Sequence, residues 1–308
     1  MRTPDDTTDD ATADTTADSV PHRVPESIAE TVRGATWRLL RSELRLVLSR
    51  RRNQAGLAVL AVVPVVIAIA VKVAGGGASD GSGSTTDSFV GSVAGNGFFV
   101  ALAALSVEIG LFLPLAVAAL SGDAIAGEAN VGTLRGLLVV PVPRTRLLAV
   151  KYAAVVLGAL LAVALVAVVG LVAGAALFGL HPVTTLSGTT LGLGAALWRL
   201  LLVGLYVGAF LAALGALGLF VSTLTEQPMG ATIAVVLVST LMWILDSISQ
   251  LHAIHPWLLV DKQLAFADLL RDPVYTADLR LGLLTDLAYG VVFVTAAWAR
   301  FGSRDVTS

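Results

Sequence analysis

The residues best suited to chemistry by type and spacing are two histidines and two aspartates in the C-terminal third of the chain. His252 and His255 are three residues apart, a spacing that can place two imidazoles on one face of a helix, and Asp246 and Asp261 are close in sequence. Trp257 follows directly, however, and histidine beside an aromatic residue is ordinary at a membrane–water interface. We therefore predict no metal site from this pattern.

Other residue types that support covalent chemistry are scarce. The chain has no cysteine and only 4 histidines, which excludes disulfides, thiolate zinc sites and cysteine nucleophiles. No Gly-Lys-Ser/Thr follows the glycine-rich stretch 75–97, so the sequence contains no phosphate-binding ATPase motif. Paired aspartates or a Ser/His dyad at membrane depth, as an intramembrane enzyme would need, are also missing. We expect no catalytic residue and no cofactor bound by this chain.

The composition is that of a membrane protein. Apolar residues make up 56% of the chain, charged residues 14%, and the mean hydropathy is +0.84, whereas soluble domains have about 45–50% and about 25%. Six apolar stretches are long enough to cross a bilayer: they lie near 54–74, 98–120, 148–172, 197–221, 229–248 and 282–300. Because these stretches are continuous rather than alternating, we predict an all-α, polytopic protein with six transmembrane helices over 54–300.

The two ends of the chain differ from this apolar region. Residues 1–25 are acidic and have few apolar side chains that a fold could bury, which predicts a disordered tail. In 26–53, apolar residues recur at three- and four-residue steps beside an arc of arginines. This pattern is typical of an amphipathic helix in the membrane interface, with an ordinary soluble helix as the alternative. Residues 301–308 form a short C-terminal tail.

The distribution of lysine and arginine predicts the orientation. With both ends inside, the inner segments hold most of the basic residues, including the cluster Arg50–Arg52. We therefore predict cytoplasmic N and C termini and a location in the cell (plasma) membrane.

Glu108 is the most deeply placed charge in the predicted spans. It lies about ten residues into the second span, where an ionised carboxylate costs roughly 3 kcal/mol or more. It either lies on a translocation path or a subunit interface, or is a protonated or hydrogen-bonded structural residue. Asp246 and Asp286 are expected at outer helix ends, in contact with water. Small-residue pairs at 170/174 and 204/208 offer positions for close helix packing.

The segment between the second and third spans carries the most information. Acidic Asp123 and Glu128 come first, then apolar Leu134 and Leu138, then prolines and basic residues. Acidic residues near the start of a helix and basic residues near its end interact favourably with the helix dipole, so this order suits a helix that begins near Asp123. The segment is expected to be either a docking site for a soluble protein or an interfacial loop held by its own salt bridges.

The order of residues in this segment resembles the hallmark of ABC transporter permeases of the type-2, export-related class. The matching positions are Asp123, Ile125, Ala126, Glu128, Gly132, Thr133, Leu134, Leu137, Leu138, Pro141, Val142, Arg144 and Lys151. The resemblance extends to the architecture over about residues 35–305, with an interfacial helix and six spans.

The resemblance implies partners and roles for these residues. Such a permease pairs with a second permease, identical or different, and with two cytoplasmic ATPase subunits that bind ATP and Mg²⁺. The loop carries a coupling helix, in which Glu128, Gly132, Thr133 and Arg135 would face the ATPase while Arg144 and Lys151 anchor the loop at the membrane. Membrane lipid is the other expected partner, and nucleic acid is not.

The sequence therefore predicts a permease subunit of an ATP-driven exporter working by alternating access. The alternative is a secondary transporter or channel driven by an ion gradient, which would need buried ionisable residues in several spans. The sequence indicates only Glu108 at such depth, and it does not indicate the substrate.

Overall fold

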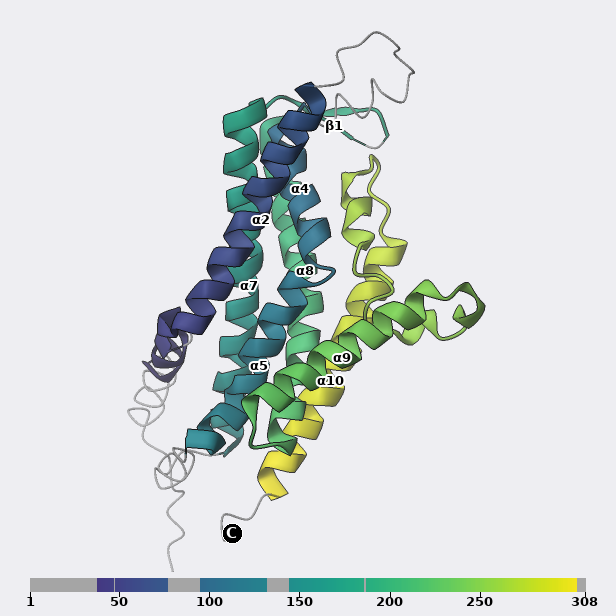
Figure 1. Cartoon of the computed structure of the whole chain (residues 1–308). Coiled ribbons are helices and arrows are strands. Elements are labelled where there is room, and N and C mark those ends of the chain that lie inside the picture. Colours follow the sequence, from purple (N-terminus) through teal and green to yellow (C-terminus); the bar gives the residue numbers. More distant parts are fainter. Residues whose placement is uncertain (1–37, 47, 77–94, 132–143, 186, 304–308) are drawn as a thin grey trace, which may run out of the picture.

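The computed structural model describes residues 38–46, 48–76, 95–131, 144–185 and 187–303, which form a bundle of long helices (Figure 1). The α-helices are α2 (Arg51–Gly76), α4 (Gly97–Glu108), α5 (Phe112–Val131), α7 (Arg144–Phe178), α8 (Leu193–Leu224), α9 (Pro228–Ser247) and α10 (Ala277–Ser303). The shorter elements are strands β1 (Val183–Thr184) and β2 (Thr190–Leu191) and the 3₁₀ helices η1 (Ser249–Leu251), η2 (His255–Trp257) and η3 (Ala265–Leu270). The predicted tail 1–25 and most of the tail 301–308 lie outside the described residues.

Six of these helices, α2, α5, α7, α8, α9 and α10, are long and apolar enough to cross a membrane. The prediction of a mostly helical, multi-pass membrane protein is confirmed, and the six helices are candidates for its spans by length and composition. The start of α2, the end of α5, the start of α7 and the end of α10 lie at the same end of the bundle (Figure 1).

The N-terminal helix is described only in part. Residues 38–46 and 48–49 are helical, Arg50 forms a bend, and α2 begins at Arg51. The described part of the predicted range 26–53 is therefore helical on both sides of a bend at Arg50, and residues 26–37 and 47 lie outside that part. Its position in a membrane interface stays a prediction.

The second predicted span, 98–120, is two helices rather than one. Helix α4 ends at Glu108 and α5 begins at Phe112, with a turn between them in which the Leu111 amide donates to the Glu108 carbonyl at 3.3 Å. Pro114 explains the position of this break, because a proline donates no hydrogen bond to the carbonyl four residues earlier and its ring clashes with it. That carbonyl belongs to Gly110, in the middle of the turn.

Helix α5 continues well past the predicted end of the span. Its 20 residues make a helix of about 30 Å, and Asp123 and Glu128 lie in its last turns. No new helix begins near Asp123, because α5 continues through it: the glycines at 122 and 127 weaken a helix without ending it. Helix α7 has 35 residues and is about 52 Å long, so it extends beyond the predicted span 148–172 at both ends.

Glycines bring α4 and α7 into backbone contact. A Cβ atom on Gly174 would lie 2.7 Å from the Gly97 Cα, and one on Gly170 would lie 2.8 Å from the Ala101 Cα. Neither position has room for a side chain, which confirms the predicted packing role of the 170/174 pair and places this contact within one chain. We conclude that α4 is fixed against α7.

The segment 249–276 connects α9 to α10 through the three 3₁₀ helices and packs back on the bundle. The Tyr206 hydroxyl of α8 donates to the Lys262 carbonyl at 2.6 Å, and the Tyr289 hydroxyl of α10 donates to the Trp257 carbonyl at 2.8 Å. The segment is thereby attached to both α8 and α10.

Asp286 is placed differently from its prediction. It is buried, with 7% of its surface exposed, and lines a cavity of about 650 Å³ between α7, α8 and α10. The expectation of a solvated helix-end charge is wrong because α10 begins at Ala277, before the predicted start at 282, so Asp286 lies more than two turns inside the helix.

Candidate functional site

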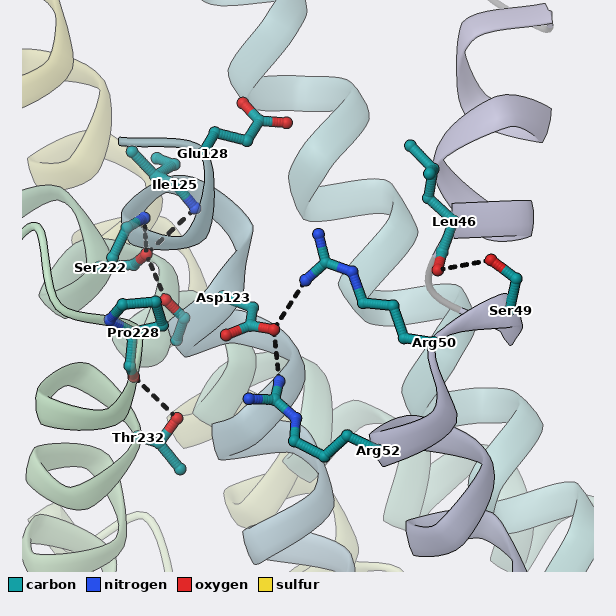
Figure 2. A network of polar contacts seen from close by, with 12 residues as sticks. Leu46, Ser49, Arg50, Arg52, Asp123, Ile125, Glu128, Ser222, Pro228 and Thr232 are labelled. Atoms are coloured by element: carbon teal, nitrogen blue, oxygen red, sulfur yellow. Dashed lines mark hydrogen bonds and ion pairs between the residues drawn. The ribbon is translucent and has the colours of Figure 1, made fainter. Parts of the chain in front are cut away.

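Charged side chains from three helical segments meet where α5 ends and α7 begins, and Figure 2 shows those of Arg50, Arg52, Asp123 and Glu128. The segments are the N-terminal helix with the first turn of α2, the last turns of α5, and the first turns of α7. We call this group the cytoplasmic charge cluster, after its predicted side of the membrane, and define it as Glu43, Arg50, Arg52, Asp123, Glu128 and Lys151.

Asp123 joins α5 to the start of α2. Its Oδ2 atom accepts from Nη1 of Arg50 at 2.8 Å and also from Nη2 of Arg52. The Asp123 side chain is 13% exposed, whereas those of Arg50 and Arg52 are 47% and 52% exposed. Figure 2 shows the carboxylate between the two guanidinium groups, so a single acceptor holds the bend residue Arg50 and the first turn of α2.

Lys151 joins the same end of α5 to α7 and to the N-terminal helix. Its Nζ atom pairs with Oε1 of Glu128 and lies 3.7 Å from Oε1 of Glu43. The lysine side chain is 4% exposed and each glutamate 16%. A charge so buried is tolerated only beside opposite charge, which the two carboxylates supply. Lys151 therefore fastens three helices through buried ion pairs.

The cluster leaves little empty space. The cavity lined by Glu43, Asp123, Glu128 and Lys151 measures about 50 Å³, and one water molecule takes about 30 Å³. The space is that of one or two water molecules, so the cluster is a packed polar junction between helices.

A buried hydroxyl connects α5 to α8 beside the charge cluster. Oγ of Ser222, which is fully buried, accepts from the amides of Ile125 at 3.1 Å and Ala126 at 2.9 Å. The same hydroxyl donates to the Gly122 carbonyl at 2.8 Å. The hydroxyl therefore lies between the Gly122 carbonyl and the Ala126 amide, which in a regular α-helix would form a hydrogen bond with each other. In this way Ser222 holds one turn of α5 from the side (Figure 2).

Small residues let α5 approach its neighbours closely at this level. A Cβ atom on Gly122 would lie 2.7 Å from Oγ1 of Thr232 in α9, and one on Gly218 in α8 would lie 2.7 Å from the Ser121 Cβ. Thr232 in turn donates to the Pro228 carbonyl at 3.0 Å. The last turns of α5 are thus enclosed by α8 and α9 on one side and by the charge cluster on the other.

Three of the predicted coupling residues, Asp123, Glu128 and Lys151, come together in this structure. Arg144 is the first residue of α7; the remaining six, Gly132, Thr133, Leu134, Arg135, Leu138 and Pro141, lie outside the described residues. The Glu128 carboxylate contacts Lys151 within the chain, and the prediction that Glu128 faces an ATPase stays a prediction. Lys151 joins α7 to α5 and to the N-terminal helix, and its role in anchoring the loop at the membrane stays a prediction.

Sequence reasoning missed four members of the site. Arg50 and Arg52 appeared only as a basic cluster at a membrane edge, and Glu43 only as part of an amphipathic helix. Nothing in the sequence singled out Ser222, because the hydroxyl of a serine in an apolar helix usually donates to the backbone carbonyl four residues earlier in the same helix.

Glu108 occupies the last turn of α4, directly before the break. It is fully buried, and neither carboxylate oxygen has a hydrogen-bond partner among the described residues. A groove of about 380 Å³ adjoins the break, lined by its neighbours Val107, Ile109 and Gly110 and by Val236 and Trp243 of α9. The choice between a translocation role and a structural role stays open at this residue.

The fold and the site together define a class, the multi-pass helical membrane proteins with a polar junction at one end of the bundle. The family model described as "ABC-2 family transporter protein" matches residues 49–243, which is more than half of the 308 residues. The chain therefore belongs to the ABC-2 transporter family and is an ABC-type permease, as its resemblance implied. A search of curated proteins found no match.

Proposed function

We propose that this chain is the membrane subunit of an ATP-driven exporter, moved by ATPase subunits that dock on the segment after Val131. The family match supports the transporter class, and ABC-2 permeases act with ABC ATPases. The observation that carries the proposal is the junction at the end of α5, where one helix end is attached to α2, α7 and α8 by separate polar contacts.

Through these contacts, a displacement on the cytoplasmic side reaches the helices inside the membrane. A displacement of the segment after Val131 moves the last turns of α5, and Asp123, Glu128 and Ser222 pass it to three other helices. The break at 109–111 separates this movement from α4, which is fixed on α7 by the glycine contacts. ATP binding in the partner then shifts the population between inward- and outward-open arrangements.

The remaining parts of the proposal concern the assembly. The chain pairs with a second permease, identical or different, in the plasma membrane, with both termini in the cytoplasm. ATP and Mg²⁺ bind to the ATPase subunits, and this chain binds no cofactor for hydrolysis and catalyses no reaction itself. Glu108, next to the 380 Å³ groove, lies on the path or at the permease interface.

One observation favours the alternative of an ion-gradient-driven transporter. Asp286 in α10 is buried as well as Glu108 in α4, so two helices carry a buried carboxylate, as such a mechanism requires. Dependence of transport on ATP, measured with the ion gradients collapsed, separates the two functions.

A labelling experiment tests the orientation. The chain has no cysteine, so a single cysteine can be placed at Asn130, exposed near the end of α5, or at Ser187, exposed beside β2. We expect a membrane-impermeant maleimide to label Ser187→Cys in intact cells and Asn130→Cys only after permeabilisation. The reverse pattern would put the junction outside and refute the proposal.

A second experiment tests the docking. The chain is purified from its native membrane in mild detergent, and the Mg²⁺-dependent ATPase activity that accompanies it is measured. We expect Arg135→Glu to remove this activity from the preparation, while Arg280→Glu, at an exposed position in α10, retains it. Equal activity in the two variants would contradict docking at the segment after Val131.

A further inference from the structure

Three side chains that are separated in sequence meet at the C-terminal end of α9, which is the end farther from the charge cluster. Asp246 lies in the last turn of α9, His255 begins η2, and Asp261 lies in the turn before η3. One ligand atom from each residue lies within 4.8 Å of the other two. We propose that these residues form a binding site for a divalent transition-metal ion of the Zn²⁺ type.

The hydrogen bond of His255 turns its other ring nitrogen toward the two aspartates. Nε2 lies 3.2 Å from the Ile248 carbonyl, which can only accept, so Nε2 carries the proton in this contact. In a neutral imidazole Nδ1 then has a lone pair, and it faces Oδ1 of Asp246 at 4.0 Å. A histidine held in this way by a backbone carbonyl is the usual arrangement of a metal ligand.

The Asp246 carboxylate supplies the second, independent observation. Its Oδ1 atom is buried and has no hydrogen-bond partner among the described residues. A buried acceptor without a partner is costly, and here it faces another acceptor, the Nδ1 lone pair of His255. A cation between the two atoms satisfies both, which a protein hydrogen bond at 4.0 Å does not.

The neighbouring lysine leaves room for the ion. Lys262 Nζ lies 3.3 Å from Oδ2 of Asp261 and 3.6 Å from Oδ1 of Asp278. It is therefore shared with a carboxylate outside the cluster and contacts one oxygen of Asp261, so the second oxygen remains available as a ligand. Two carboxylates and a neutral imidazole give the site a net negative charge.

The ligand set and its spacing favour a metal of the Zn²⁺ type. One imidazole nitrogen and two carboxylate oxygens suit Zn²⁺, Mn²⁺ or Fe²⁺ rather than Cu⁺. Ligands at about 2.1 Å from a tetrahedral metal are about 3.4 Å apart, so the cluster needs only rotamer adjustments to close around an ion. Asp246 and His255 are 26% and 19% exposed, which leaves the fourth position to water.

The structural role of such an ion follows from the elements that carry its ligands. It joins the end of α9 to the segment 249–264, which the Tyr206 and Tyr289 hydroxyls already attach to α8 and α10. His252, the other histidine of the sequence pattern, is exposed and takes no part in the cluster.

The test measures metal binding to the purified full-length chain in detergent, with any polyhistidine tag removed. We expect isothermal titration with Zn²⁺ to give one site per chain, and Co²⁺ to give visible absorption from an imidazole-containing site. His255→Ala and Asp246→Asn should each weaken Zn²⁺ binding at least tenfold. The matched control is His252→Ala, three residues away, which should bind Zn²⁺ like the unchanged protein.

Three results would overturn the proposal. These are no Zn²⁺ binding by the unchanged chain, equal binding by His255→Ala, or an equal loss in His252→Ala. Asp246→Asn guards against misfolding as an explanation, because the amide has nearly the same shape as the carboxylate. A variant that keeps its melting temperature without metal, but no longer gains stability when Zn²⁺ is added, supports the site directly.

Discussion

Replacing Lys151 with methionine tests the charge cluster most directly. Methionine has a similar volume without the charge, so the change removes the ion pairs and leaves the packing of α7. The separation of 3.7 Å between Nζ and the Glu43 carboxylate corresponds to an attraction of about 4 kcal/mol at an effective dielectric constant of about 20. Glu128 contributes a second, closer pair.

The net effect is smaller than the sum of these attractions, because the charges gave up hydration when they were buried. Breaking a buried pair by removing one partner typically costs about 3–5 kcal/mol, and we expect Lys151→Met to lower the free energy of unfolding by that amount. Glu128→Gln should have an effect of the same sign, and the double variant should lose less than the sum of the two.

The measurement is a double-mutant cycle on the purified chain, followed by denaturant unfolding in detergent. A coupling energy of about 1–3 kcal/mol between positions 128 and 151 is expected for residues in direct contact. Arg280→Met, at an exposed position in α10, is the control and should change stability by less than about 0.5 kcal/mol. Additive effects at 128 and 151, or an unchanged stability in Lys151→Met, would refute the interpretation of the cluster as a buried ionic junction.

Three further predictions concern contacts inside the bundle. Ser222→Ala removes three hydrogen bonds to α5 and should lower stability by about 1–3 kcal/mol; Thr285→Ala, whose hydroxyl is exposed and bonds only its own helix, should not, and equal melting temperatures would count against the Ser222 contact. Gly174→Leu places atoms where the Gly97 backbone lies, so it should prevent recovery of folded protein in detergent, and a monodisperse variant would show that α4 and α7 can separate. Glu108→Gln removes a buried charge that has no partner among the described residues and should keep or raise the melting temperature; a clear drop would reveal a partner for the carboxylate.

The number and rough position of the spans could be predicted because they depend on local composition. A run of about 20 apolar residues satisfies the bilayer requirement wherever it occurs, and each predicted span overlaps one or two of the observed helices. The break in the second predicted span was harder to predict from the sequence. The steric clash of Pro114 acts four residues earlier, so the helix ends before the proline and not at it.

The partners in the candidate site could not be predicted, because they depend on tertiary contacts. Asp123 and Arg50 are 73 residues apart, and the contact of Ser222 with Ala126 spans 96 residues. Asp286 was placed in water because its helix was expected to start five residues later than it does. In each case a short stretch of sequence contains the residue but not the neighbour that decides its role.

The hydroxyl of Ser222 limits the ways in which α5 can move. It bridges a single turn, and the backbone beside it has space only for a hydrogen atom at Gly122. Sliding α5 along its axis by one turn would bring the methyl group of Ala126 or Ala118 to that place, where it would collide with Thr232. The contacts at Ser222 and Thr232 therefore oppose a translation of α5 along its axis, and a tilt about Ser222 is the movement that they oppose least.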